Sequence, residues 1–193
     1  MSDVARIPAT PTGERCLLDE ASMARTVLRL AHEVHEKHAS LDGVLLAGVR
    51  TRGVPLAQRV ARALRGLGAG DVAVAELDID DYRDDRPRPA VPRPGALRLA
   101  GSGCVPAVDG VAVIVVDDVF YTGRTLRAAL SAVHDAGRPA SVDMLVLVDR
   151  GHRELPMRAT FVGKNVPTAA GERVMVRVRE IDGVDGTFLV AAE

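Results

Sequence analysis

The stretch VIVVDDVFYTGRT, residues 113–125, decides the fold that this sequence predicts. It begins inside a continuous apolar run, residues 111–116, which is typical of a strand buried on both faces of a parallel sheet. The run ends at Asp117 and Asp118, and after the turn FYTGR residues 125–136 have the pattern of a helix closed by a glycine. The stretch therefore predicts a strand, a loop and a helix of an α/β sheet.

The same alternation continues on both sides of this unit. Apolar runs that predict further strands lie at residues 44–49, 72–77 and 142–148, and apolar side chains at helical spacing predict helices over residues 19–37 and 54–67. Strands that alternate with helices imply right-handed crossovers and a mostly parallel sheet. The predicted fold class is therefore α/β, with a central, mostly parallel sheet flanked by helices.

The length of 193 residues fits one domain, which at this size can bury roughly 70% of the surface of the unfolded chain. Residues 1–16 are rich in Pro, Thr and polar side chains and are expected to be flexible, which leaves residues 17–193 as the domain. Residues 173–180 alternate polar and apolar like a half-exposed strand, and residues 187–192 are expected to pair nearby. Residues 86–109 have no clear period, and so long a segment is usually functional or disordered.

Composition excludes several classes of protein. No stretch approaches the roughly 20 apolar residues that span a bilayer, and the N-terminus lacks the apolar core of a signal peptide, so we expect a cytoplasmic protein without a membrane partner. The two cysteines, Cys16 and Cys104, have no spacing suited to zinc and are expected to be free thiols. Because the formal net charge is −1, a polyanionic partner requires a local basic patch.

The polar residues after the decisive strand have the chemistry of a ribose-phosphate site. Ligands of open α/β sheets bind at the carboxyl ends of the strands. There, Asp117 and Asp118 can accept hydrogen bonds from vicinal hydroxyls, Gly123 lets the backbone approach a phosphate, and the amides that open the helix attract the anion. A lone acidic pair would more often only cap a sheet, but here it stands directly before the phosphate cradle.

The loop GVRTRG, residues 48–53, follows another predicted strand. Its backbone amides, flanked by Arg50 and Arg52, could hold a diphosphate, since guanidinium groups match phosphate oxygens. The alternative is an ordinary solvated turn. The P-loop pattern G-x-x-x-x-G-K-S/T is absent from the sequence.

Residues 113–125 resemble the signature with which type I phosphoribosyltransferases bind 5-phosphoribosyl-1-diphosphate (PRPP). Over residues 17–180, interrupted at 86–109, the sequence resembles one particular family, the pyrimidine operon regulatory (PyrR) family. The strings that carry this resemblance are LLDE, RLAHE, GVRTRGVPLAQR, YRDD, VDDVFYTGRT, LVDRGHRELPMRA and VGKNVPT. Members of that family bind RNA and also have uracil phosphoribosyltransferase activity. The resemblance implies a type I phosphoribosyltransferase fold with a small hood and a flexible lid, in a homodimer or higher oligomer.

The implied reaction converts uracil and PRPP to UMP and diphosphate, with Mg²⁺ carried mainly by PRPP and no direct metal ligand in the protein. In this family Thr51 and Arg52 would contact the diphosphate, while Asp117 and Asp118 would bind the ribose hydroxyls. Electrostatic stabilisation should matter most when diphosphate leaves, so Arg52 and the two aspartates are the candidate catalytic residues. Asp118 is also a possible general base. The candidate PRPP- and UMP-binding residues are Arg50, Thr51, Arg52, Gly53, Asp117, Asp118, Val119, Phe120, Tyr121, Thr122, Gly123, Arg124, Thr125, Arg150 and Lys164.

Two longer segments complete the implied site. Residues 80–108 are expected to form a lid that closes over PRPP and excludes water. Residues 149–168, with the C-terminal strands, are expected to form the hood over the base, where Arg150 and Lys164 could contact the pyrimidine or nucleotide. His152 lies in this segment as well, although a lone histidine more often has a structural role.

An RNA interface rests on five residues: Arg25, Arg29, His32, Arg153 and Arg158. Together they could contact phosphates and exposed loop bases, although a charged helix face is usually only solvated. The favoured hypothesis is a transferase that senses UMP or UTP and binds the mRNA leader of pyrimidine operons. A salvage phosphoribosyltransferase without an RNA role, and a sensor without catalysis, remain alternatives, as do transcription attenuation and translational repression.

Overall fold

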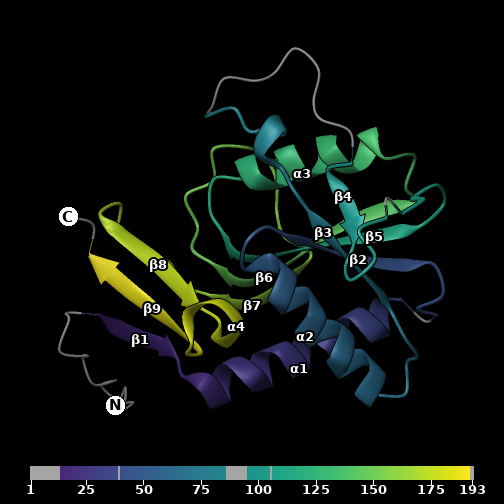
Figure 1. Cartoon of the computed structure of the whole chain (residues 1–193). Helices are drawn as coiled ribbons and strands as arrows, with labels where there is room; N and C mark the ends of the chain where they lie inside the picture. Colours follow the sequence, from purple (N-terminus) through teal and green to yellow (C-terminus); the bar gives the residue numbers. More distant parts are fainter. Residues whose placement is uncertain (1–13, 39, 86–94, 105, 192–193) are drawn as a thin grey trace.

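The computed structural model describes residues 14–38, 40–85, 95–104 and 106–191, arranged around two sheets (Figure 1). The large sheet contains β2 (Val44–Val49), β3 (Ala73–Leu77), β4 (Leu97–Leu99), β5 (Ala112–Phe120), β6 (Ser141–Asp149) and β7 (Phe161–Asn165). The small sheet contains β1 (Arg15–Leu18), β8 (Glu172–Arg177) and β9 (Gly186–Ala191). The helices are α1 (Glu20–Lys37), α2 (Gly53–Gly66), η1, a single 3-10 turn (Asp80–Tyr82), α3 (Arg124–Asp135) and α4 (Arg179–Asp182).

The large sheet has the strand order β4-β3-β2-β5-β6-β7, and its five longest strands run parallel. Only the edge strand β4 is antiparallel to its neighbour β3. Strand β2 is buried along its whole length, as a strand covered on both faces must be. These observations confirm the predicted mostly parallel α/β sheet.

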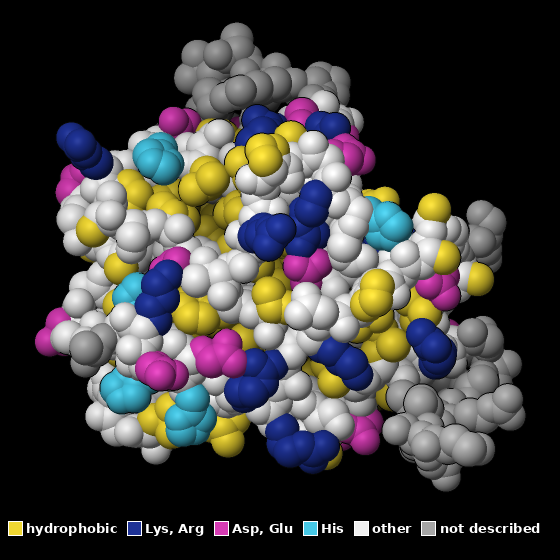
Figure 2. All heavy atoms as spheres, turned by 180° about the vertical axis from the view of Figure 1, so that it is seen from behind, with side chains coloured by type: hydrophobic (Ala, Val, Ile, Leu, Met, Phe, Trp, Pro, Cys, Tyr) yellow, Lys and Arg dark blue, Asp and Glu magenta, His cyan; other side chains and the backbone are white. Residues whose placement is uncertain are grey.

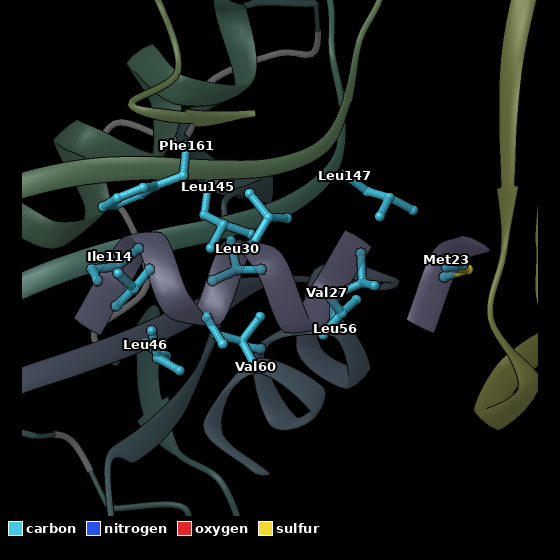
Figure 3. Close-up of a cluster of buried hydrophobic side chains, with 14 of the residues drawn as sticks. Met23, Val27, Leu30, Leu46, Leu56, Val60, Ile114, Leu145, Leu147 and Phe161 are labelled. Carbon is cyan, nitrogen blue, oxygen red and sulfur yellow. The ribbon is translucent and has the colours of Figure 1, made fainter. Parts of the chain in front are cut away.

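Helices α1 and α2 cover one face of the large sheet and α3 covers the other (Figure 1). Asp19 caps α1, since its carboxylate accepts a hydrogen bond of 2.8 Å from the amide of Ser22. The apolar face of α1 packs against α2 and the sheet in one continuous cluster (Figure 3), which includes Met23, Val27, Leu30, Leu46, Leu56, Val60, Ile114, Leu145, Leu147 and Phe161. No helix in the described part of the chain is long and apolar enough to cross a membrane.

Strand β5 is longer than the apolar run that predicts it. The apolar residues end at Val116, but the strand continues through Asp117 and Asp118 to Phe120. Strand β6 pairs with this extension, with Asp117 opposite Val146 and Phe120 opposite Asp149. Because the neighbouring strand supplies hydrogen-bond partners, the backbone stays extended where the side chains become polar.

Three other segments differ from the sequence-based expectation. Arg15 and Cys16, within the stretch expected to be flexible, belong to β1 and pair with β9; residues 1–13 of that stretch lie outside the described residues. Within the expected lid, η1 and β4 are ordered parts of the fold, and Leu97 is fully buried; residues 86–94 and 105 of it lie outside the description. Strand β7, expected in the hood, joins the large sheet beside β6.

The small sheet, in the order β1-β9-β8, forms a separate antiparallel layer beside the carboxyl ends of the large sheet (Figure 1). Strands β8 and β9 correspond to the alternating C-terminal pattern, and their pairing confirms that prediction. The small sheet buries Leu18, Val176 and Leu189 in the same apolar cluster as α1. This layer, together with residues 178–185 that connect β8 and β9 and include α4, is called the hood below.

Gly53, the first residue of α2, fixes how closely that helix approaches β5. A Cβ atom at Gly53 would lie 2.3 Å from the carbonyl oxygen of Val116, whereas a Cβ atom at Gly66, the last residue of the same helix, would meet nothing within 4 Å. We therefore expect Gly53→Ala to lower the free energy of unfolding by about 1–3 kcal/mol through overpacking. Gly66→Ala should be neutral or stabilise by up to about 1 kcal/mol.

Urea unfolding of both variants measures this difference. Equal stability of the two variants would contradict the close approach of α2 to β5.

Candidate functional site

The loop between β5 and α3, residues 121–123, presents the first turn of α3 to the carboxyl edge of the large sheet. Gly123 precedes the helix with φ of 95°, a left-handed conformation that favours glycine, and no side-chain cap hydrogen bond is made there. The Thr122 hydroxyl accepts a hydrogen bond of 3.3 Å from the Arg124 amide. Backbone amides and hydroxyls at the positive end of a helix dipole form a cradle suited to an anion.

A cavity of about 200 Å³ lies against this cradle. Its lining residues come from the β5–α3 loop and from the segment around η1: Ile79, Arg83, Asp84, Asp85, Phe120, Tyr121, Thr122, Gly123, Arg124 and Thr125. Arg124 spans the cavity wall, with ion pairs of 2.6 Å to Asp84 and 2.7 Å to Glu154. The predicted phosphate-binding residues thus lie together on one cavity.

Asp117 and Asp118 lie at the carboxyl end of β5, partly buried and hydrogen-bonded to the local backbone. The Asp117 carboxylate accepts a bond of 2.9 Å from the Asp118 amide, and the Asp118 carboxylate accepts one of 2.7 Å from the Val119 amide. Burial, and next the charge of Asp118, raise the pKa of Asp117 well above its usual range. Burial also raises the pKa of Asp118, although the Val119 amide and the charge of Arg52 oppose the rise.

The loop between β2 and α2, residues 50–52, sends its two arginines in different directions. Arg52 makes a double hydrogen bond to Asp182 of α4. It follows β2, the neighbour of β5 in the sheet, and its charge acts on Asp118. Arg50 instead reaches β3, where it pairs with Glu76 at 3.0 Å and lies 3.3 Å from Asp78. The structure therefore brings Arg52, but not the Arg50 side chain, to the site.

The two residues expected to contact the base are held by other parts of the protein. Arg150 is only 7% exposed, and its guanidinium donates to the Thr168 hydroxyl at 3.2 Å and to the Glu172 carbonyl at 2.5 Å. The same guanidinium lies 4.1 Å from the centre of the Tyr121 ring. The Lys164 ammonium donates to the Leu17 carbonyl of β1 at 2.9 Å. Both side chains therefore attach the hood to the large sheet in this structure.

Two residues of the string between the aspartates and Thr122 serve the core. Phe120 is almost fully buried, and Val119 packs against the cluster around α1. Tyr121, in contrast, is exposed and stands over Arg150, with the ring of His152 at 6.1 Å in an edge-on contact. His152 bonds the Thr168 carbonyl at 2.6 Å, which agrees with the structural role that is usual for a lone histidine.

The candidate RNA residues form two groups on either side of β7. Arg25, Arg29 and His32 are exposed along one face of α1. Arg29 pairs with Glu33 and reaches the backbone carbonyls of Val162 and Gly163 in β7. Because Arg29 bonds β7 directly, this face of α1 continues onto the edge of the large sheet.

The second group consists of Arg153 and Arg158, which line a cavity of about 360 Å³ together with Val162. Arg153 donates 2.6 Å to the Tyr121 carbonyl, pairs with Asp149 and lies 4.1 Å over the Phe120 ring. It is therefore largely committed to the β5–α3 loop. Val162 is shared by both groups, since its carbonyl accepts from Arg29 and the residue lines the cavity.

Sequence patterns alone do not reveal Asp182 as a neighbour of the site. The string REIDGVD, residues 179–185, contains three acids, but nothing in their spacing points to the loop 130 residues earlier. The neighbouring acids Glu180 and Asp185 both pair with Arg59 of α2. Only the packing of the hood against α2 brings these charges together.

Comparison with known proteins agrees with this geometry. A phosphoribosyl transferase domain model matches residues 16–173. The chain is similar to the "Bifunctional protein PyrR" of Chloroflexus aurantiacus, with 49% identity over 177 residues that cover 92% of this chain and 95% of the relative. The protein of the same name from Leifsonia xyli is 46% identical over 180 residues, which cover 91% of this chain and 96% of the relative.

Among solved structures, the chain is similar to a hypoxanthine phosphoribosyltransferase from Staphylococcus aureus, with a TM-score of 0.68, 14% identity and 92% of each chain covered. The hypoxanthine phosphoribosyltransferase of Trypanosoma cruzi gives a TM-score of 0.66 at 19% identity and covers 92% of this chain and 97% of that one. At such identities the likeness concerns the fold alone. With the domain match and the close relatives, it follows that the chain belongs to the PyrR family of type I phosphoribosyltransferases.

Proposed function

We propose that this protein is a uracil phosphoribosyltransferase that also binds pyrimidine-operon mRNA and regulates pyrimidine biosynthesis genes in response to uridine nucleotides. The observation that carries the proposal is the adjacency of three groups at one sheet edge. The amide cradle of α3 follows the carboxylates of Asp117 and Asp118 along the chain, and Arg52, at the end of the neighbouring strand β2, acts on Asp118 through its charge. Relatives named "Bifunctional protein PyrR" support two roles in one chain.

These three groups match the three parts of PRPP. The α3 cradle, with Thr122 to Thr125, suits the 5′-phosphate. The two aspartates suit the ribose hydroxyls, and Arg52 with Thr51 suits the diphosphate, since a guanidinium matches phosphate oxygens in pairs. Hydroxyl donors at the two carboxylates would replace the water that burial removes from them.

Mg²⁺ takes oxygen ligands and is commonly bound through substrate phosphates, and the carboxylate chemistry of this site fits that preference. When bound with PRPP, the ion would neutralise charge on the departing diphosphate. The chain itself would bind and orient the ribose between its phosphates. It would also hold two carboxylates near the positive charge that develops on the ribose.

In the proposed reaction the bond between the ribose C1 and the diphosphate oxygen breaks, and a bond from uracil N1 to the same carbon forms. The electron pair of the broken bond leaves with diphosphate, whose negative charge Arg52 would meet. The proton of uracil N1 must pass to a base, for which the raised pKa of Asp118 makes that carboxylate a candidate.

The RNA role would rest on a local surface and not on overall charge. Figure 2 shows Lys and Arg side chains spread over one face of the molecule and interspersed with Asp and Glu. The cations of the two groups beside β7, Arg29 with its α1 neighbours and Arg158 with Arg153, would contact phosphates and unstacked bases. A cytoplasmic location and a homo-oligomeric state remain predictions from the sequence.

Replacement of both site carboxylates tests the transferase. Asp117→Asn with Asp118→Asn removes the negative charge beside the ribose, so we expect uracil incorporation into UMP to fall by at least about 10²–10³-fold. The assay follows labelled uracil with PRPP and Mg²⁺. Asp42→Asn is the matched control, because this exposed carboxylate precedes β2 at the opposite end of the sheet. Full activity in the double variant would refute the site assignment.

The buried carboxyl of Asp117 should also make stability depend on pH. Its raised pKa means that its stabilising, protonated form is fully present below about pH 3.9, the unfolded value, and is lost as pH rises through the folded value. Without ligand, Asp117→Asn should therefore raise Tm near pH 8 and change it less near pH 4. Each kcal/mol corresponds to about 2–4 °C at this size. A lower Tm for the variant at pH 8, measured by calorimetry, would count against the buried charge.

Arg29→Ala or His32→Ala should weaken retention of a pyrimidine-operon leader RNA in a mobility-shift assay. If Arg29 neutralises one phosphate, the slope of log K against log salt should become shallower by about 0.7. Arg65→Ala, an exposed arginine at the far end of α2, is the control and should leave the slope unchanged. An absence of wild-type binding, with or without UMP, would instead favour a salvage enzyme without an RNA role.

A further inference from the structure

The hood holds Arg52 in one orientation through a double hydrogen bond. The Nε atom of Arg52 lies 3.1 Å from one carboxylate oxygen of Asp182, and its Nη2 atom lies 2.8 Å from the other. Such side-on pairing fixes the plane of the guanidinium as well as its position. Arg52 thereby joins the loop after β2 to helix α4, across 130 residues of sequence.

This pairing leaves the other edge of the guanidinium available. A guanidinium carries five N–H donors in a fixed fork, and the bond to Asp182 uses one from Nε and one from Nη2. In the described part of the chain these are the hydrogen bonds that the Arg52 side chain makes. Three N–H donors, two on Nη1 and one on Nη2, therefore remain at the end of the guanidinium, where they can bind an anion; these donors are called the free fork below.

Asp182 is itself firmly placed. The oxygen that faces Nε of Arg52 also accepts a hydrogen bond of 2.8 Å from the Val178 amide, which fixes the carboxylate to its own turn. The bond from Arg52 also lowers the pKa of Asp182, so the group stays ionised at neutral pH. The carboxylate therefore acts as a fixed negative support behind the guanidinium.

A second contact keeps the whole turn against α2. Arg59 follows Arg52 by seven residues, about two helical turns, and so lies on the same side of α2. It donates to Glu180 at 2.9 Å and to Asp185 at 2.7 Å, on either side of Asp182 in sequence. Arg59 therefore attaches the hood to α2 without taking part in the contact between Arg52 and Asp182.

We propose that Asp182 is a positioning residue for the transfer reaction, which holds the free fork of Arg52 toward the diphosphate of PRPP. This role rests on the proposed function. Its physical basis is preorganisation, since a long side chain fixed before the substrate arrives loses less freedom on binding. The charge of Asp118 also acts on Arg52, because β2, which ends just before the Arg52 loop, lies beside β5 in the sheet.

A double-mutant cycle tests this role. Asp182→Ala should lower kcat/KM for PRPP on the order of tenfold or more, because misplacement of a substrate-binding group by about 1 Å can reduce rates up to about a hundredfold. The KM for uracil should not change. In an Arg52→Ala background, Asp182→Ala should have no further effect on kcat/KM for PRPP, since Asp182 acts through Arg52. Asp182→Glu should recover part of the loss.

Glu180→Gln is the matched control, because it weakens the hood contact of Arg59 and leaves Arg52 with Asp182. It should lower Tm without a change in kcat/KM for PRPP. Three results would overturn the proposal: an unchanged or higher kcat/KM for PRPP in Asp182→Ala, additive effects in the cycle, or an equal fall in kcat/KM in Glu180→Gln.

A wild-type protein that transfers no uracil would refute the proposed function alone. The same variants would then be titrated with inorganic diphosphate by calorimetry. Weaker binding in Asp182→Ala, but not in an Arg52→Ala background, would support the role of Asp182. Equal affinity of Asp182→Ala and wild type would reject it.

Discussion

Two adjacent carboxylates near the carboxyl end of a central parallel strand are the constraint on which the rest of this molecule depends. Asp117 and Asp118 remain in β5 because β6 pairs with the strand beyond its apolar part. Burial raises the pKa of both side chains, so keeping them charged lowers the stability of the fold at this point. The surrounding elements, the α3 cradle and the Arg52 loop, are arranged around that charge.

Sequence patterns predicted the part of the fold that depends on local periodicity. A window of about ten residues is enough to recognise the apolar runs of β2, β5 and β6 and the amphipathic faces of α1 and α3. The string that ends in Thr125 also predicted the start of a helix, which the structure shows at Arg124. These features were predictable because neighbouring residues in the chain determine them.

The unpredicted features depend on contacts between distant segments. Strand β1 exists because β9 pairs with it, and β4 exists because β3 does, although neither has a strong period of its own. Arg150 shows the same limit within the site. Its place in the motif suggested a ligand contact, but a buried guanidinium needs acceptors, and Thr168 with the Glu172 carbonyl supplies them. Which of several acceptors an arginine meets is a property of tertiary packing.

Arg153 has a consequence for how the two proposed activities would communicate. Its guanidinium bonds the Tyr121 carbonyl of the phosphate-side loop and also lines the cavity beside β7, with Arg158. A nucleotide that shifts Tyr121 would therefore alter the surface offered to RNA. Thermodynamic linkage makes such an effect reciprocal: if the nucleotide changes RNA affinity by some factor, RNA changes nucleotide affinity by the same factor. Through Arg153, bound RNA would thereby change how much nucleotide the protein binds.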